Sequence, residues 1–129
     1  MTKPYDLIGG EAALRTLTTR FYELMDSLPE AQTIRAMHPD DLEESTEKLF
    51  MFLSGWLGGP SLYIERYGHP FLRARHMPFS IASEESAAWM LCMRQALAET
   101  VADEALREQL DKALSSIADH MRNRPETQG

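Results

Sequence analysis

Residues 61–82 read SLYIERYGHPFLRARHMPFSIA, and they separate two long stretches of helical periodicity. The segment contains prolines, two of the four histidines, two of the four tyrosines and three arginines. Its apolar residues follow no regular spacing, so we predict a loop. A loop of more than about 15 residues within a small domain is usually functional or ordered by a ligand. We therefore expect the functional site to include this segment.

Helical patterns come before this segment. The first follows Gly9-Gly10, and its apolar face is made of Leu14, Leu17, Phe21, Leu24 and Leu28. A short helical piece is predicted from Glu30 to about Met37. A longer helix follows the acidic pair Asp40-Asp41, ends at Gly58-Gly59-Pro60, and has as its apolar residues Leu42, Leu49, Phe52, Leu53 and Trp56.

Two more helices are predicted after the segment. Ser83 can cap the first, which is apolar on nearly every side from Ala87 to Met93 and is expected to be central and buried. Cys92 lies in this run, so we interpret it as part of the core rather than as a nucleophile. The last helix starts near Asp103 and aligns Leu106, Leu110, Ala113, Leu114, Ile117 and Met121. No segment shows sustained strand alternation, so the predicted fold class is all-α.

Composition limits the classes of partner. The chain has 129 residues, enough for one domain over residues 1–129, with residues 1–8 as an N-terminal extension and residues 124–129 as a frayed tail. Lys and Arg number 13 against 20 Asp and Glu, and the formal net charge of −7 disfavours nucleic acids and anionic membranes as partners. With neither a membrane-spanning stretch nor a signal peptide in the sequence, we expect a cytoplasmic protein.

His76 is the candidate metal ligand. No His-Glu-x-x-His or Cys-x-x-Cys motif accompanies it, so a zinc site is unsupported. One imidazole can still ligate an iron whose other donors come from a porphyrin, provided that apolar side chains flank the ring and a cation reaches a propionate. Phe52 and Phe79 could flank such a ring, and Arg73 or Arg75 could bind a propionate. From the residues alone, a solvated loop histidine remains the simpler interpretation.

An ordered set of short motifs resembles the group II truncated haemoglobins. In chain order the motifs are Gly9-Gly10, Phe21-Tyr22, Met37-His38-Pro39, Leu49-Phe50-Met51-Phe52-Leu53, Gly58-Gly59-Pro60, Gly68-His69-Pro70, Arg75-His76-Met77-Pro78-Phe79 and Ala88-Trp89. A single Gly-Gly pair is weak evidence, but the ordered set is highly specific. The resemblance implies a globin-like fold, a truncated two-over-two helical sandwich around haem b, which is iron protoporphyrin IX.

The resemblance also implies which residues contact the haem. His76 matches the proximal ligand of the iron, and Arg75 matches the partner of a propionate. Phe52 and Phe79 would contact the porphyrin. Weaker candidates for haem contacts are Tyr63, Tyr67 and Arg73. The remaining histidines, His69 and His120, are expected to order the loop and to face solvent, respectively.

On the distal side, three polar positions of the family are matched by Tyr22, His38 and Trp89. Ser45 and Leu49 match the distal-helix positions nearest the bound ligand. Without the resemblance, Tyr22 would be interpreted as a boundary tyrosine with its hydroxyl in water, Trp89 as core bulk and His38 as an exposed turn residue. His38 would also add a group that titrates near neutral pH.

The function implied by the resemblance is reversible binding of oxygen and related diatomic ligands. A redox or detoxification role would involve nitric oxide, peroxide or peroxynitrite. Whether the chain is an enzyme stays open, because a haem-dependent dioxygenase or peroxidase-like activity would need electrons from an unidentified reductase. Two other functions remain possible at this point: an oxygen or redox sensor, and a haem-free helical interaction module.

Overall fold

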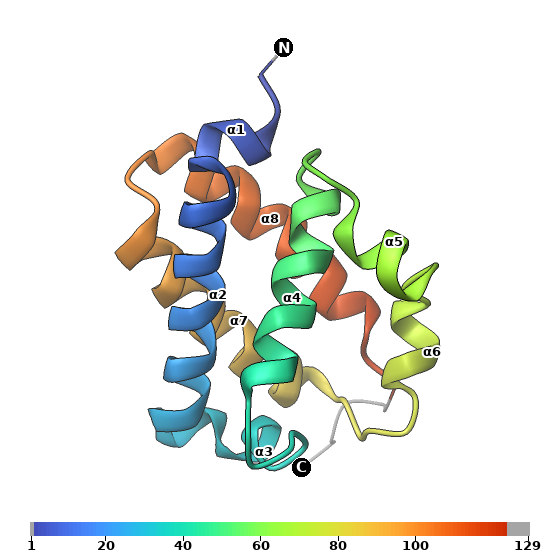
Figure 1. The fold of residues 1–129 in the computed structure, drawn as a ribbon. Helices are drawn as coiled ribbons and strands as arrows, with labels where there is room; N and C mark the ends of the chain where they lie inside the picture. The colour runs from blue at the N-terminus through green and yellow to red at the C-terminus, as the bar shows by residue number, and fades with distance from the viewer. Residues whose placement is uncertain (1, 124–129) are drawn as a thin grey trace.

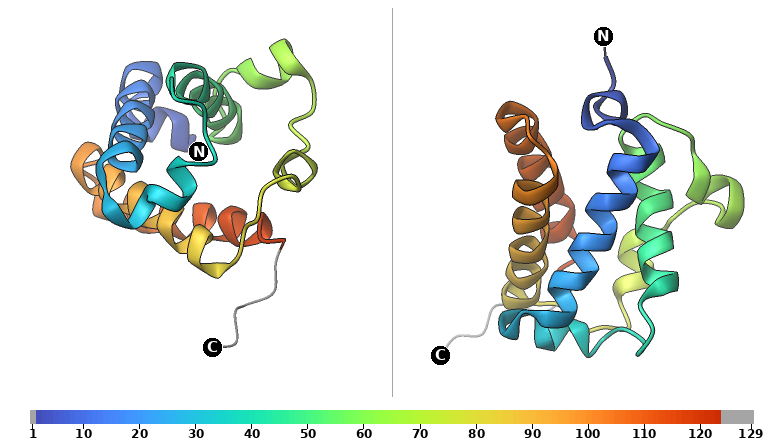
Figure 2. Two further views of the ribbon diagram at one scale, coloured as in Figure 1. Left: turned by 90° about the horizontal axis from the view of Figure 1, so that it is seen from below. Right: turned by 60° about the vertical axis from the view of Figure 1, so that its left-hand side comes forward.

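The computed structural model describes residues 2–123, and within them every regular element is a helix (Figure 1). The four longest are α2 (Gly10–Ser27), α4 (Glu43–Trp56), α7 (Ser83–Thr100) and α8 (Glu104–His120). α2 packs against α4 and α7, and α7 packs against α8. Figure 2 shows α2 beside α4 on one side of the molecule and α7 beside α8 on the other. The predicted two-over-two all-α sandwich is confirmed.

Shorter helices connect the long ones. They are α1 (Pro4–Ile8), the 3-10 turn η1 (Pro29–Ala31), α3 (Gln32–Arg35), α5 (Leu62–Tyr67) and α6 (Leu72–His76). η1 and α3 together confirm the predicted short helical piece. α1 lies within the expected N-terminal extension, residues 1–8, and packs against α2. The expected frayed tail, residues 124–129, lies outside the described residues.

The prediction of a loop over residues 61–82 is wrong in part, because α5 and α6 both lie within it. These helices have six and five residues. A pattern of period 3.6 needs about 11 residues to be recognised, so neither helix produces a periodic signal. Gly68, with a φ of 81°, ends α5, and Phe71 begins α6 from the left-handed conformation with a φ of 47°. The chain therefore turns sharply twice before it reaches His76.

The core lies between the long helices. Leu14, Leu17, Phe21 and Leu24 of α2 are at most 2% exposed, as the apolar face predicted, and Cys92 of α7 is fully buried. Two expectations fail. Trp56 is 36% exposed at the end of α4, and Leu91 is 37% exposed, so α7 is not buried on nearly every side.

The helix starts confirm one predicted start and correct one predicted cap. α8 starts at Glu104, next to the predicted Asp103, and the Asp103 carboxylate caps it by accepting a hydrogen bond of 3.2 Å from the Leu106 N–H. Ser83, by contrast, is the first residue of α7 and not its cap. There the Glu85 carboxylate accepts a hydrogen bond of 2.8 Å from the Ala82 N–H instead.

α1 is fixed to the end of α4 by close backbone packing. The Tyr5 N–H donates a hydrogen bond of 3.0 Å to the Leu57 carbonyl oxygen. The Tyr5 ring lies directly on Gly59, where an added Cβ atom would clash with the ring carbons. Gly59 is therefore required because a side chain there has no space.

Across residues 2–123, no helix combines the length and the apolar character that crossing a membrane requires.

Candidate functional site

His76 is the last residue of α6 and is half-buried. Its Nδ1 lies 2.6 Å from the carbonyl oxygen of Leu72, one helical turn earlier. A carbonyl oxygen only accepts hydrogen bonds, so Nδ1 carries the proton and donates it. The lone pair of the ring is then on Nε2, which is the form in which a neutral histidine ligates a metal.

Three polar side chains predicted for the distal side come from three different elements and lie close together. Tyr22 is on α2, His38 follows α3, and Trp89 is on α7. The ring centroids of Tyr22 and His38 are 5.8 Å apart in an edge-on arrangement. Phe21 joins the group, with ring centroids 4.9 Å from Tyr22 and 5.0 Å from Trp89. The predicted distal trio is therefore one cluster in the structure.

Two donors of this cluster have no acceptor within residues 2–123. Tyr22 is only 8% exposed, yet its hydroxyl makes no hydrogen bond in this part of the chain, and neither does the indole N–H of Trp89. Burial raises the pKa of Tyr22 far above its usual value, so the hydroxyl keeps its proton. Both groups can thus donate to a bound ligand.

His38 differs from the other two because its donor is already used. Its Nδ1 lies 2.8 Å from the carbonyl oxygen of Ile34, so the proton is on Nδ1 and Nε2 is an acceptor. Burial lowers the pKa of His38, and the nearby charges of Arg35 and His76 lower it further, against the opposing effect of the Ile34 hydrogen bond. His38 therefore stays neutral near pH 7, although the sequence indicated a group that titrates there.

The remaining predicted contacts lie on α4 and on the segment after α6. Leu49 and Phe52 of α4 are half-buried, as is Ser45 one turn before Leu49. Phe79, after α6, is 39% exposed. Ser45, Leu49 and Phe52 are therefore only partly covered by the protein, and Phe79 is exposed, so their predicted contacts with a haem remain a prediction.

The two tyrosines of α5 have different environments. Tyr63 is buried, and its ring centroid lies 6.5 Å from that of Phe52 and 5.0 Å from that of Tyr67. Tyr67 is 36% exposed, and the Lys48 Nζ lies 5.4 Å from its ring centroid. Tyr63 therefore packs α5 against α4, while Tyr67 lies at the surface beside a cation.

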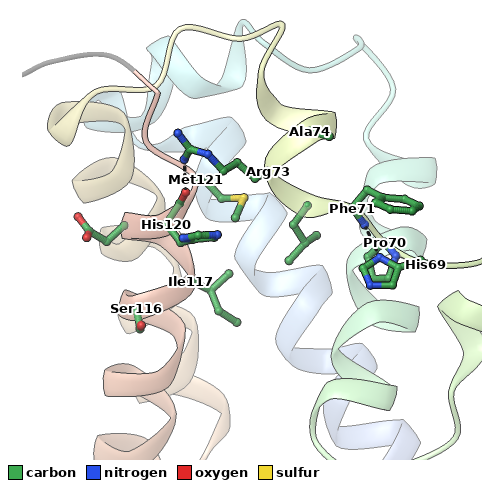
Figure 3. Close-up of a pocket in the computed structure, with 11 residues that line it drawn as sticks. His69, Pro70, Phe71, Arg73, Ala74, Ser116, Ile117, His120 and Met121 are labelled. Carbon is green, nitrogen blue, oxygen red and sulfur yellow. Dashed lines mark hydrogen bonds between the residues drawn. The ribbon is translucent and has the colours of Figure 1, made fainter.

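Arg73 is already bound to the end of α8. Its Nη1 donates hydrogen bonds to the carbonyl oxygens of His120 at 2.7 Å and Arg122 at 2.8 Å, and Figure 3 shows the contact with His120. Arg75 is exposed, and its guanidinium has no hydrogen bond or ion pair with the rest of residues 2–123. Of the two arginines, Arg75 is the one whose guanidinium donors are all without a partner in the described part of the chain.

A cavity of about 680 Å³ lies between α6 and α8 (Figure 3). Leu72, Ile117 and Met121 contribute apolar side chains to its lining, and His69 and His120 are at its edge. The His69 Nδ1 accepts a hydrogen bond of 3.1 Å from the Phe71 N–H, so His69 orders the turn before α6 as expected, and His120 is exposed as expected. No sequence pattern indicates Ile117 as a cavity residue, because its spacing fits the core face of α8 equally well.

These residues fit a haem on three observations. His76 offers Nε2 for a fifth iron ligand, and half-buried Leu49 and Phe52 offer apolar surface to a flat ring. The hydroxyl of Tyr22 and the indole N–H of Trp89 are unpartnered donors within the described residues. Donors without a partner in the protein can bind a ligand that lies beside them.

Comparison with known proteins identifies the family. The family model of the bacterial-like globins matches residues 3–123. The group 2 truncated hemoglobin YjbI of Bacillus subtilis (strain 168) is 42% identical over 125 residues, which cover 97% of this chain and 92% of that protein.

Solved structures give the same result. A group II 2-on-2 hemoglobin from Agrobacterium tumefaciens superposes with a TM-score of 0.93 at 47% identity, covering 98% of this chain and 97% of that one. A truncated haemoglobin from Bacillus subtilis, described as oxygen-avid, superposes with a TM-score of 0.87 at 42% identity, covering 95% and 100%. The chain therefore belongs to the bacterial-like globins, among the group II truncated haemoglobins, which are haem-binding proteins for oxygen and related diatomic ligands.

Proposed function

We propose that the chain binds one haem b in a single domain spanning residues 1–129, with His76 as the proximal iron ligand. The observation that carries this proposal is the 2.6 Å hydrogen bond from the His76 Nδ1 to the Leu72 carbonyl oxygen. Histidines that ligate metals usually donate their other ring N–H to a carbonyl or carboxylate, which fixes the tautomer and the direction of the free nitrogen. Neither His69 nor His120 has such a bond within residues 2–123.

Haem, when bound, supplies a binding position for oxygen or nitric oxide and the capacity to exchange electrons. The protein supplies the surroundings. Leu49, Phe52 and Phe79 are proposed to contact the porphyrin, and Arg75 is proposed to bind a propionate through charge-assisted hydrogen bonds. Tyr67 is a weaker candidate for a propionate contact.

On the distal side, Trp89 and Tyr22 are proposed as the donors to the bound ligand. Trp89 can only donate, and Tyr22 can both donate and accept. His38 is proposed to accept at Nε2, because its Nδ1 proton is directed to Ile34. Ser45 is small and leaves space for a ligand to enter.

A redox or detoxification role suits this distal side better than oxygen delivery. Two donors without protein partners would hold oxygen firmly and release it slowly, and slow release favours reaction with nitric oxide or peroxide. The Bacillus subtilis relative described as oxygen-avid is consistent with this. Turnover would require electrons from a separate reductase, which is the proposed protein partner.

The proximal assignment can be tested on the purified protein. We expect one haem per chain, identified as haem b by its pyridine haemochrome spectrum. His76→Gly should lose most of the haem, and added imidazole should restore binding by replacing the missing ring. His120→Ala, which removes an exposed histidine from α8, is the control and should retain haem fully. An unchanged ferrous spectrum in His76→Gly would exclude His76 as the ligand.

The proposed chemistry can be tested separately by mixing the oxygenated ferrous protein with nitric oxide. Rapid formation of nitrate together with the ferric protein is expected. If nitrate does not form while oxygen binding is normal, the nitric oxide reaction is excluded, and peroxide consumption with a reducing substrate is the remaining assay for the redox role.

A further inference from the structure

The helix that carries His76 packs little against the other helices. α6 has only five residues, and none of them is buried. A single helical turn is unstable on its own in water, so α6 needs tertiary contacts to keep its direction. Polar contacts with the end of α8 provide them.

Asn123, which follows α8, binds the chain around His76 with its backbone and its side chain. The Nδ2 group donates hydrogen bonds to the carbonyl oxygens of His76 at 3.1 Å and Phe79 at 2.9 Å. The Oδ1 atom accepts a hydrogen bond of 2.9 Å from the Ile81 N–H, and the Asn123 N–H donates one of 2.8 Å to the Ile81 carbonyl oxygen. One residue thus fixes the backbone at both ends of the segment from 76 to 81.

Arg73 makes the reciprocal contact from α6. Its guanidinium donates to the carbonyl oxygens of His120 and Arg122, at the same end of α8 that Asn123 follows, and Figure 3 shows the contact with His120. Arg73 lies one turn before His76, so α6 is held both at its middle and at its end. The hydrogen bond from His76 to Leu72 fixes the ring relative to α6 only, and these contacts fix α6 relative to the fold.

We propose that Asn123 and Arg73 are positioning residues that fix the direction in which His76 presents Nε2 to the iron. The inference rests on the proposed role of His76 as proximal ligand. Residues that orient a metal ligand through a second contact typically change metal affinity by roughly 10- to 100-fold when they are removed. The contacts of Asn123 and Arg73 are of this kind, although they act on the backbone of α6 instead of on the imidazole.

The test compares Asn123→Ala, Asn123→Asp and Arg73→Ala with wild type as purified holoproteins. Asn123→Asp keeps an acceptor for the Ile81 N–H but removes both side-chain donors. The matched control is Arg107→Ala, because the Arg107 guanidinium also donates to two carbonyl oxygens, those of Val101 at 2.6 Å and Ala102 at 3.1 Å, but at the opposite end of α8. Two quantities are measured: the rate of haem transfer to excess apomyoglobin, and the iron–histidine stretching band of the ferrous protein in resonance Raman spectra.

All three test variants should lose haem faster, by roughly tenfold for Asn123→Ala, with a shifted or broadened iron–histidine band. Arg107→Ala should keep the wild-type band even if its thermal stability falls. A wild-type band and transfer rate in Asn123→Ala and Arg73→Ala would overturn the proposal, and so would the same band shift in Arg107→Ala. If Asn123→Ala does not accumulate as a folded protein, Asn123→Asp and Arg73→Ala decide the question.

The same experiment distinguishes this inference from the proposed function. His76→Gly should abolish the iron–histidine band. If the band survives in His76→Gly, the proximal assignment itself is wrong. If it disappears there but is unchanged in the Asn123 and Arg73 variants, only the positioning role fails.

Discussion

Replacing Trp89 with Phe tests the distal site most directly. The substitution keeps an aromatic ring against Phe21, whose centroid lies 5.0 Å from that of Trp89, and removes only the indole N–H and part of the ring. That N–H has no acceptor within residues 2–123, so its hydrogen bond can go entirely to a bound ligand. We expect Trp89→Phe to accelerate oxygen release from the ferrous protein.

The expected magnitude follows from the worth of one hydrogen bond. A net contribution of about 1 to 2 kcal/mol, if it is lost in the escape transition state, corresponds to a rate increase of roughly five- to thirtyfold. Tyr22→Phe should have a smaller effect. The Tyr22 hydroxyl makes no hydrogen bond within residues 2–123, but the ring of His38, whose Nε2 is an acceptor, has its centroid 5.8 Å from that of Tyr22. A small movement would let His38 compete with the ligand for the Tyr22 proton.

The assay is stopped-flow displacement of oxygen by carbon monoxide at one pH, for wild type and both variants. Absorption spectra of the carbon monoxide forms check that the haem environment is otherwise intact. Release at the wild-type rate in Trp89→Phe, with normal spectra, would mean that Trp89 is core bulk and that the distal assignment is wrong. A larger effect in Tyr22→Phe would instead make Tyr22 the principal donor.

Two further predictions concern stability. The pKa of His38 is lowered in the folded protein, mainly by burial, so below about pH 6.5 the unfolded chain binds a proton more readily than the folded chain does. Wild type should therefore lose more stability than His38→Phe as the pH falls from about 7.5 to 5.5. Urea unfolding at several pH values measures this difference. An equal loss in both proteins would contradict a buried neutral His38. Asp103→Ala removes the cap of α8 and should lower the free energy of unfolding by about 1 kcal/mol, whereas Ala at exposed Glu108 should change it little.

Long helices were predictable from sequence because several turns repeat the same signal. α2 and α8 have 18 and 17 residues, and their apolar faces lie in the core as the spacing indicated. α6 has five residues, too few for a helical period to appear, and it contains His76, the proposed iron ligand. Its helical state depends on tertiary contacts that no local pattern encodes.

The candidate site was predictable in composition but not in hydrogen bonding. The motifs indicated Tyr22, His38 and Trp89, and the structure brings them together. The sequence could not show that the Nδ1 proton of His38 is directed to Ile34, which changes His38 from a possible donor into an acceptor.

Nor could it show that Arg73 binds α8 or that Asn123 binds a segment 42 to 47 positions earlier. Such long-range polar contacts depend on how the helices pack. A single sequence contains no spacing that reveals them.

The contact between Tyr5 and Gly59 has a genetic consequence. Ala at position 59 should lower stability because the Tyr5 ring occupies the space that its Cβ needs. Tyr5→Ala should therefore suppress the effect of Gly59→Ala, and the two substitutions should show strong positive epistasis. Gly68 is the opposite case. Nothing lies within 4 Å of its missing Cβ, and its φ of 81° alone disfavours a side chain, so no substitution elsewhere that leaves the backbone in place should suppress Gly68→Ala. A suppressor screen would therefore distinguish the two glycines, although neither of them tolerates a side chain.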